Sequence, residues 1–249
     1  MQRSSSAARL AASLVVTAGG SGAGSAYNYR VLMVRRVGGG SFGGAHVFPG
    51  GVEEAGDARN AERWRTSAAH VCAVRETAEE TGVHVALDSL RAIGRWTTPR
   101  EAATRFDTRF FTAHIASPPS ELSLQAGEVD AADWVCPAAV LHANAGGEVR
   151  LLPPQFCILT EMARFTRWQD LRALPDAPHV EPVLCRRSDG RCVALLPGDC
   201  AYAPGGAPVP DAGLFAADSL GLNRIVMTPA AGGGFVAACL LRTASAEHA

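Results

Sequence analysis

The sequence has no excess of charge of either sign. Its 23 basic and 24 acidic residues give a formal net charge of −1. A balance this close to zero argues against broad, sequence-independent contact with a nucleic-acid backbone, which needs a basic surface. A local basic pocket for a small polyanionic substrate is still compatible with it.

No hydrophobic run reaches the length of a membrane span. The longest apolar stretches fall short of the roughly 20 residues that a transmembrane helix requires. With 249 residues, 47% of them hydrophobic, the chain is expected to be a soluble globular protein without a membrane partner. Its length suits one large domain, or one domain plus an extension.

The cysteines lack any paired pattern. There are seven, scattered through the chain without a Cys-x-x-Cys pair. Neither a zinc site nor a disulfide framework is therefore indicated, and we expect a reducing, intracellular compartment. Cys72 lies one helical turn before Glu76, and core packing is the role we favour for it.

The most informative feature present is an acidic stripe. Residues 75–83 read RETAEETGV, which places Glu76, Glu79 and Glu80 at i, i+3 and i+4 on one face of a helix. Like charges at these spacings oppose helix formation by about 0.2–0.5 kcal/mol per pair. A bound cation explains the stripe better than the alternative, a solvated acidic face.

The segment before this helix suits the same site. Residues 48–51 read FPGG, and the two glycines let the backbone approach a ligand closely. An exposed main-chain carbonyl in such a loop is a hard oxygen ligand suited to magnesium. Glu53 and Glu54, which follow, are expected to be solvated loop charges.

Together these residues resemble the Nudix box, whose pattern is Gly, five residues, Glu, seven residues, then Arg-Glu-apolar-x-Glu-Glu-x-Gly-apolar. The matching positions are Gly51, Arg75, Glu76, Glu79, Glu80, Gly82 and Val83. Thr77 stands where an aliphatic residue is usual, and Asp57 replaces the first glutamate. The 17 residues 58–74 replace the family's seven, and we interpret the excess as an insertion in the loop.

This resemblance implies a metal-dependent Nudix hydrolase. The metal ligands that it implies for Mg²⁺ or Mn²⁺ are Glu76, Glu79, Glu80 and the Gly51 carbonyl. Arg75 would brace the glutamates, although pairing with a glutamate of its own helix is the structural alternative. Asp57 is expected to be a peripheral member of the site.

The group that accepts the proton from water is left open. Glu80 is one candidate, and Glu128 is the other, because a loop glutamate before a closing strand (here 131–135) resembles a family position. A solvated loop charge is an equal alternative for Glu128. For His46 we favour a strand histidine beside the core over a base or phosphate contact.

Apolar runs predict the elements around this site. Strands are expected at 11–18, 29–35, 45–48, 90–96, 108–114 and 131–135, and helices at 66–80, ending at Gly82, and at 154–168. The expected fold class is α/β (α+β): a Nudix fold with a mixed sheet sandwiched between helices.

The chain is predicted to have three parts. They are a flexible tail at 1–8, a Nudix hydrolase domain at 9–170, and a β-rich extension at 171–249 packed on that core, with strand-like runs at 183–185, 193–196, 225–228 and 235–241 and a loose loop at 201–213. Residues 1–10 have the composition of a transit peptide, so targeting stays open.

Several further stretches resemble the coenzyme A diphosphatase branch of the family, the nucleoside diphosphate-linked moiety X motif 19 type. They read AASLVVTAGG, GAHVFPGGV, CAVRETAEETG, RFDTRFF, LLPPQF, LLPGD and NRIVM, and they span nearly the whole chain. The resemblance implies cleavage of the diphosphate of coenzyme A or acyl-coenzyme A to 3′,5′-ADP and (acyl-)phosphopantetheine. It also implies a peroxisome, although the terminal AEHA lacks a Ser-Lys-Leu address; mitochondrion and cytosol stay open.

The coenzyme A signature of that branch is only partly present. It runs Leu-Leu-Thr-x-Arg-Ser/Thr, three residues, Arg, three residues, Gly, three residues, Phe-Pro-Gly-Gly. Its spacing is kept by Leu32, Arg35, Gly44 and residues 48–51, but Arg36 replaces the hydroxyl residue and Gly40 the second arginine. The resemblance therefore implies Arg35, Arg36 and Gly50 as substrate-binding residues, with one phosphate clamp missing.

The missing arginine has candidate replacements at 105–109. Strand alternation would place Arg105, Asp107 and Arg109 on one face, where the arginines could line a cleft with Asp107 holding one of them. A structural ion pair is an equal alternative. Two other functions also stay open: hydrolysis of another nucleoside diphosphate derivative, such as ADP-ribose, a nucleotide sugar or capped RNA, and a non-catalytic ligand sensor on a Nudix scaffold.

Overall fold

The computed structural model describes residues 7–20, 26–38, 42–174, 179–186, 191–202, 223–229 and 235–242. Residues 1–6 of the expected tail, Gly40, and most of the expected loop at 201–213 lie outside these ranges. Within them, no helix is both long and apolar enough to cross a membrane.

A nine-stranded mixed sheet forms the centre of the molecule. Seven strands follow the order β8-β3-β2-β1-β6-β5-β9, while β4 pairs with β1 and β7 with β2. Their bounds are β1 (Arg9–Gly19), β2 (Tyr29–Arg36), β3 (Ala45–Val47), β4 (Gly50–Val52), β5 (Arg91–Thr97), β6 (Phe106–Ile115), β7 (Val129–Val135), β8 (Arg150–Leu151) and β9 (His179–Val180). β1 runs parallel to β6 but antiparallel to β2 and β4.

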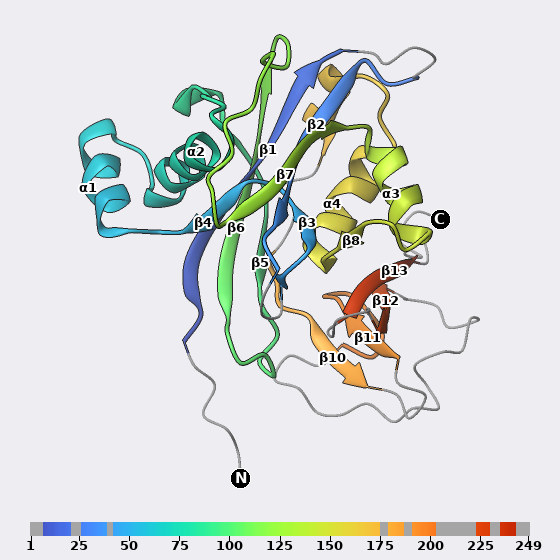
Figure 1. Cartoon of the computed structure of the whole chain (residues 1–249). Coiled ribbons are helices and arrows are strands. Elements are labelled where there is room, and N and C mark those ends of the chain that lie inside the picture. The colour runs from blue at the N-terminus through green and yellow to red at the C-terminus, as the bar shows by residue number, and fades with distance from the viewer. Residues whose placement is uncertain are drawn as a thin grey trace.

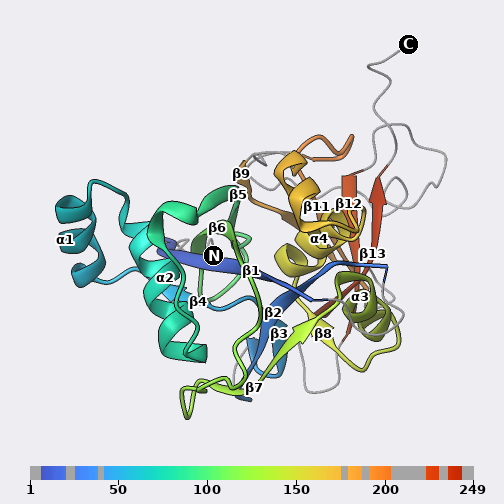
Figure 2. The same ribbon diagram turned by 90° about the horizontal axis from the view of Figure 1, so that it is seen from above.

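Helices cover both faces of this sheet (Figure 1). The helices on one side are α1 (Ala55–Trp64) and α2 (Ala68–Thr81), and those on the other are α3 (Pro137–Ala145) and α4 (Pro153–Met162). Figure 2 shows the same three layers from above. Two short 3-10 helices, η2 (Leu87–Ser89) and η3 (Trp168–Ala173), complete the layers. The predicted fold class, a mixed sheet between helices, is confirmed.

β1 explains why the sheet needs a helical layer on each face. Its residues from Ala11 to Ala18 are all buried. Leu14 and Val16 belong to the core cluster that contains Cys72 of α2, whereas Val15 belongs to the cluster that contains Leu159 of α4. A continuous apolar run with alternating destinations is typical of a strand covered on both sides.

The C-terminal strands form a second, smaller sheet. β10 (Val183–Arg186), β11 (Cys192–Leu195), β12 (Asn223–Pro229) and β13 (Phe235–Arg242) are antiparallel neighbours in that order. Ala194 and Ile225 from this sheet are buried in the same cluster as Val15 and Leu159 of the main sheet and α4. The two sheets therefore share one hydrophobic core.

Three local predictions differ from the structure. The insertion expected to be a loop forms α1, whose start is fixed by a capping box between Glu54 and Asp57. The helix expected at 154–168 ends at Met162 and is followed by η3. α3, which begins with Pro137 at its first position, was not expected.

Candidate active site

α2 holds the acidic stripe at a fixed position. The Ser67 side chain accepts a hydrogen bond from the His70 N–H at its start, and Gly82 ends it in the left-handed conformation with φ of 73°. Cys72 is buried in the core beneath, as predicted, and burial raises the pKa of its thiol to about 12. Because Cys72 packs α2 into the core, the glutamates in the following turns of the helix lie next to β4.

Arg75 is hydrogen-bonded to three carboxylates at once. Its Nε and Nη2 donate to the two Asp57 oxygens, each at 2.9 Å. Its Nη1 donates to Glu76 Oε1 and to Glu79 Oε2, also at 2.9 Å each. The planar guanidinium of Arg75 thus fixes Glu76 and Glu79 relative to Asp57.

The position of Asp57 corrects the expectation that this residue is peripheral. Its side chain is only 1% exposed, and it also accepts the Glu54 N–H at 2.9 Å at the start of α1. Burial alone would raise the pKa of Asp57, but the hydrogen bonds from Arg75 and from the Glu54 backbone outweigh it and hold the pKa below its usual range. The ten extra residues lie between Asp57 and Arg75 in the sequence, and the fold still brings these two side chains together.

Gly51 lies against the Glu76 carboxylate. A Cβ at position 51 would come within 2.3 Å of Glu76 Oε1, so any other residue would displace that glutamate. A Cβ on Gly50 would similarly meet the Ala12 backbone oxygen at 2.3 Å. The two glycines therefore let β4 lie close to both α2 and β1.

Glu80 is the most buried member of the stripe. Its side chain is 1% exposed, Oε2 accepts the Gly50 N–H at 2.9 Å, and Oε1 lies 3.9 Å from Arg36 Nη1. Burial, with smaller contributions from the charges of Glu76 and Glu128, raises the pKa of Glu80 to about 7. Burial likewise raises the pKa of Glu76.

Glu79 and Glu128 are more open. The Glu79 side chain is 48% exposed, and Glu128 accepts a hydrogen bond from Gln125 Nε2 at 3.2 Å. The Glu128 charge acts on both Glu76 and Glu80, so this loop glutamate lies within electrostatic range of the stripe. Glu53 is half-buried rather than fully solvated, and burial raises its pKa.

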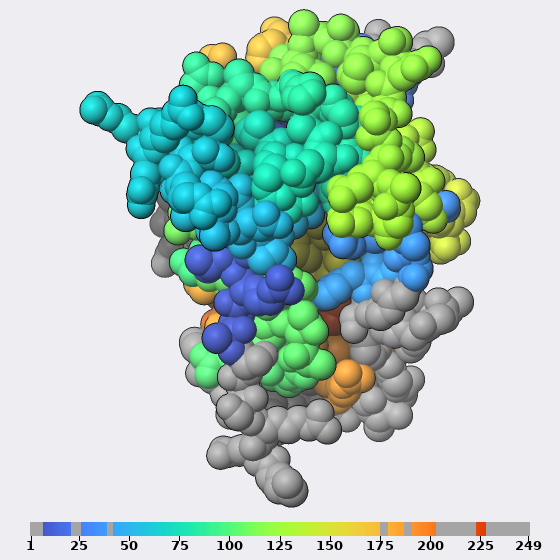
Figure 3. All heavy atoms as spheres, turned by 60° about the vertical axis from the view of Figure 1, so that its left-hand side comes forward, coloured from blue at the N-terminus to red at the C-terminus, as the bar shows by residue number. Residues whose placement is uncertain are grey.

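A pocket of about 310 Å³ adjoins this carboxylate cluster. It extends from Gly50 and Gly51 of β4 past the aromatic rings of Phe48, Trp96 and Phe106 to the start of α4. On the side of α1 and α2, the surface is hollowed between the blue residues of β3 and the green residues of β6 (Figure 3). The pocket therefore opens next to the glutamates.

The face of β6 that lines the pocket is not the face that was expected to carry substrate-binding arginines. Phe106, Thr108 and Phe110 face the pocket from β6, and the opposite face carries Asp107 and Arg109. Asp107 pairs with Arg95 of the neighbouring strand β5, not with Arg105 or Arg109. Both faces of β6 are covered, so strand alternation alone could not show which one borders the pocket.

The individual arginines have other partners. Arg105 donates to Glu181 at 2.7 Å, and Arg35 donates to Asp130 at 2.7 Å. Arg109 is exposed, and its charge acts on Glu53. Of the four predicted substrate arginines, Arg36 is the one that lines the pocket.

His46 lies in β3 with its Nδ1 buried and without a hydrogen-bond partner, outside the pocket lining. Burial lowers the pKa of this histidine. A strand histidine beside the core was the expected role, and its position agrees with that role.

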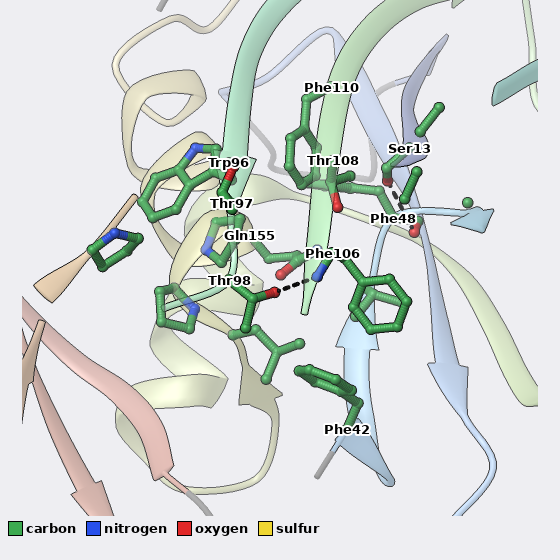
Figure 4. A pocket seen from close by; sticks show the side chains of 18 of the residues that line it. Ser13, Phe42, Phe48, Trp96, Thr97, Thr98, Phe106, Thr108, Phe110 and Gln155 are labelled. Carbon is green, nitrogen blue, oxygen red and sulfur yellow. Dashed lines mark hydrogen bonds between the residues drawn. The ribbon is translucent and has the colours of Figure 1, made fainter. Parts of the chain in front are cut away.

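Sequence reasoning missed most of the pocket wall. Phe42 and Phe106 form an edge-to-face pair with ring centroids 6.0 Å apart, and Gln155 reaches in from the first turn of α4 (Figure 4). The stretch LLPPQF, residues 151–156, was identified as family-like and as the start of the helix expected at 154–168. Nothing in its local pattern indicates that the Gln155 side chain enters a pocket.

Comparisons with known proteins agree with this site. The sequence model of the NUDIX domain family matches residues 8–156. Over 124 residues the chain is 31% identical to the acyl-coenzyme A diphosphatase NUDT19 of Gallus gallus, a match that covers 46% of this chain and 32% of that protein. The chain therefore matches only about a third of the relative's length.

A solved structure also resembles this fold. The crystal structure of a Nudix hydrolase from Alicyclobacillus acidocaldarius superimposes with a TM-score of 0.61 at 26% identity, covering 70% of this chain and all of that one. The family match spans more than half of the sequence. Taken with the braced glutamates beside Gly51, it shows that the chain belongs to the NUDIX domain family.

Proposed function

We propose that the protein is a metal-dependent diphosphatase that cleaves coenzyme A or acyl-coenzyme A to 3′,5′-ADP and (acyl-)phosphopantetheine. The observation that carries the hydrolase assignment is the arrangement of Glu76, Glu79 and Glu80 against Gly50 and Gly51, fixed by Arg75. Arg75 compensates part of the negative charge of these carboxylates, and a bound divalent cation would compensate the rest.

The residues present fit a hard divalent cation. No group of three or more acidic, histidine or cysteine side chains in the described ranges already converges on one point. Arg75 uses Glu76 Oε1 and Glu79 Oε2, which leaves the second oxygen of each as a ligand. Glu80 Oε2 and the Gly51 carbonyl each accept one hydrogen bond, from the Gly50 N–H and the Cys72 thiol, and each oxygen keeps a lone pair for a cation. All are oxygen atoms of the kind that Mg²⁺ and Mn²⁺ prefer.

When bound, such an ion would neutralise the diphosphate and lower the pKa of a water molecule. The protein's own groups do the rest. Glu80 or Glu128 accepts the proton of the attacking water. Arg36, 3.9 Å from Glu80, supplies positive charge to the phosphate oxygens at the pocket entrance.

The coenzyme A assignment has separate support. It rests on the similarity to an acyl-coenzyme A diphosphatase and on the retained signature spacing, including Arg35 and Gly50. The second candidate is hydrolysis of another nucleoside diphosphate derivative. The observation that favours it is the replacement of the signature's second arginine by Gly40.

A substrate panel tests the proposal. Purified protein with Mg²⁺ or Mn²⁺ is incubated with coenzyme A, acetyl-coenzyme A, ADP-ribose, a nucleotide sugar and capped RNA, and the products are separated by chromatography. Faster release of 3′,5′-ADP from coenzyme A than of AMP from ADP-ribose supports the proposal, and the reverse order supports the second candidate. No turnover of any substrate with either metal would support a ligand sensor.

The Glu80→Gln variant separates chemistry from folding. Glutamine keeps an acceptor for the Gly50 N–H but removes the carboxylate. We expect kcat to fall about 10²–10⁴-fold, the range assigned to a general base, with a circular dichroism spectrum like that of the wild type. Glu79→Gln should also remove turnover, and wild-type activity in both variants would overturn the mechanism.

A further inference from the structure

The pocket beside Gly50 and Gly51 is almost free of charge. Among the described residues that line it, Arg36 is the only charged side chain, and it lies at the end next to Glu80. Beyond that end, the walls are Phe42, Phe106, Trp96 and several prolines. A charged group would find no counter-ion deep in this pocket, so its occupant there is neutral.

Among the described residues that line the pocket, the polar uncharged side chains are the hydroxyls of Ser13, Thr97, Thr98 and Thr108 and one carboxamide, that of Gln155. Gln155 is only 6% exposed, and its Oε1 is buried without a hydrogen-bond partner. Figure 4 shows its side chain between the β5 residues Trp96 and Thr97 and the β6 residue Thr108, inside the pocket. A buried acceptor left unsatisfied costs about 1–3 kcal/mol. The orphan oxygen therefore points to a ligand that supplies a donor.

The helix start makes Gln155 the main polar feature at this end. Pro153 and Pro154 occupy the first two positions of α4 and carry no N–H groups, and no side chain caps the helix. The Phe156 N–H is already bonded to the Leu152 oxygen at 2.9 Å. The side-chain carboxamide thus presents the hydrogen-bonding group to the pocket.

A carboxamide offers one acceptor and two donors in a single plane. A secondary amide, with its N–H and C=O, is a matching partner flanked by apolar chain. The two arms of coenzyme A differ in this respect: the pantetheine arm is uncharged and contains amides, whereas the adenosine arm carries a further phosphate. The neutral pocket and the orphan carboxamide both favour the first arm.

We propose that this pocket holds the amide-bearing pantetheine arm of the substrate and that Gln155 recognises it by hydrogen bonding to an amide. This inference rests on the proposed function for its choice of substrate. Arg36 and the glutamates then face the diphosphate at the pocket mouth. Gln155 sets which class of diphosphate is accepted and takes no part in bond cleavage.

The test uses Gln155→Met, which keeps an unbranched side chain of similar length but removes both hydrogen-bonding functions. Gln169→Leu, at an exposed glutamine of η3 outside the pocket, is the control for the loss of a carboxamide. Binding of 4′-phosphopantetheine and of 3′,5′-ADP to the full chain is measured by calorimetry in Mg²⁺, and turnover of coenzyme A is measured in parallel.

The expected result is specific to one fragment. Gln155→Met raises the Kd for 4′-phosphopantetheine at least tenfold, leaves the Kd for 3′,5′-ADP within twofold, and raises KM for coenzyme A more than it lowers kcat. Its melting temperature stays equal to that of the wild type or rises, because the unsatisfied oxygen is gone. A Gln155 needed only for packing would instead lower the melting temperature and leave both Kd values unchanged.

Failure of the inference and failure of the proposed function are distinguishable. Equal 4′-phosphopantetheine affinity in wild type and variant overturns the inference even if coenzyme A is cleaved, and so does a wild type that does not bind the fragment. Weaker binding of 3′,5′-ADP instead overturns it in favour of a nucleobase pocket. Gln155-dependent binding of 4′-phosphopantetheine without cleavage of coenzyme A keeps the inference and removes the proposed function.

Discussion

Arg75 concentrates the positioning of three carboxylates in one side chain. Its guanidinium donates simultaneously to Asp57, Glu76 and Glu79. Lysine is a point charge on a flexible stem and cannot reproduce this fork. We expect Arg75→Lys to lower kcat about 10–100-fold, in line with the cost of small misplacements of reacting groups.

Steady-state kinetics and thermal denaturation check this prediction. The matched control is Arg164→Lys, because Arg164 is 69% exposed and forms an ion pair with Glu161 just beyond the end of α4. The control should retain wild-type kcat. A kcat within twofold of the wild type in Arg75→Lys would show that a single positive charge is enough.

Gly51 sets the distance between β4 and Glu76. In Gly51→Ala the new methyl group would lie 2.3 Å from the Glu76 carboxylate, so the glutamate must move. The clash is with the end of the Glu76 side chain, so the main expected effect is its displacement from the site: diphosphatase activity should fall at least tenfold. Gly38→Ala is the control, since nothing lies within 4 Å of a Cβ there. Equal activity in both variants, measured under saturating metal, would refute the prediction.

Residues could be assigned to the site from the sequence where helical periodicity alone places them together. Helical spacing alone places Glu76, Glu79 and Glu80 on one face. Asp57 could not be placed in the same way, because its contact with Arg75 spans 18 positions and depends on where the inserted residues go. Gln155 was missed for a related reason: its role arises from an unfilled hydrogen bond, which only the packed pocket shows.

At the scale of elements, α1 is the part that the chain adds to the Nudix pattern. It begins with a capping box and ends at Arg65, which has φ of 54° and is the one described non-glycine residue with positive φ. A side chain in this left-handed conformation costs roughly 1 kcal/mol relative to glycine. The helix end is therefore strained.

We expect Arg65→Gly to stabilise the protein by about 0.5–1 kcal/mol, which is roughly a 1–4 °C rise in melting temperature for a chain of this size. Arg63→Gly provides the contrast, because Arg63 lies inside the last turn of α1, where glycine destabilises by about 1 kcal/mol. Calorimetric scans of both variants measure the difference. A lower melting temperature in Arg65→Gly would show that its side chain makes contacts that outweigh the strain.

The strands were easier to predict than the helices. A long apolar run such as β1 is recognisable in the sequence, because both faces of the sheet are covered there. α1 has only Asp57 and Ala61 buried, so it carries little apolar signal. Three-residue strands such as β4 depend on pairing with β1, a contact between positions some 40 apart that no local pattern encodes.

For the whole molecule, the C-terminal sheet is tied in by a buried ion pair. Asp199 accepts two hydrogen bonds from Arg224 at 2.7 Å, and both side chains have no exposed surface. Asp199 also accepts the N–H groups of Ala201 and Asn223. Because Ile225, next along β12, lies in the shared core, loss of this pair should weaken the whole fold.

Asp199→Asn should therefore lower the free energy of unfolding by about 3–5 kcal/mol at pH 7, since it leaves the buried guanidinium without its carboxylate.

The pKa of Asp199 makes this contribution depend on pH. Burial alone would raise the pKa of Asp199, but the hydrogen bonds from Arg224 and the backbone outweigh it, so the folded-state pKa is lowered. The unfolded chain then takes up this proton first as the pH falls below about 4. The stability that the carboxylate contributes is present above that pH and is lost as the pH falls through the folded-state pKa.

Urea unfolding followed at pH 7 and in steps down to pH 3 measures this linkage. The difference in free energy of unfolding between wild type and Asp199→Asn should be largest near neutrality and should shrink below pH 4. Asp170→Asn, at an exposed aspartate of η3, should show no such difference. An early, separate transition in Asp199→Asn would mean that the small sheet unfolds alone, because one shared core predicts that both sheets unfold together.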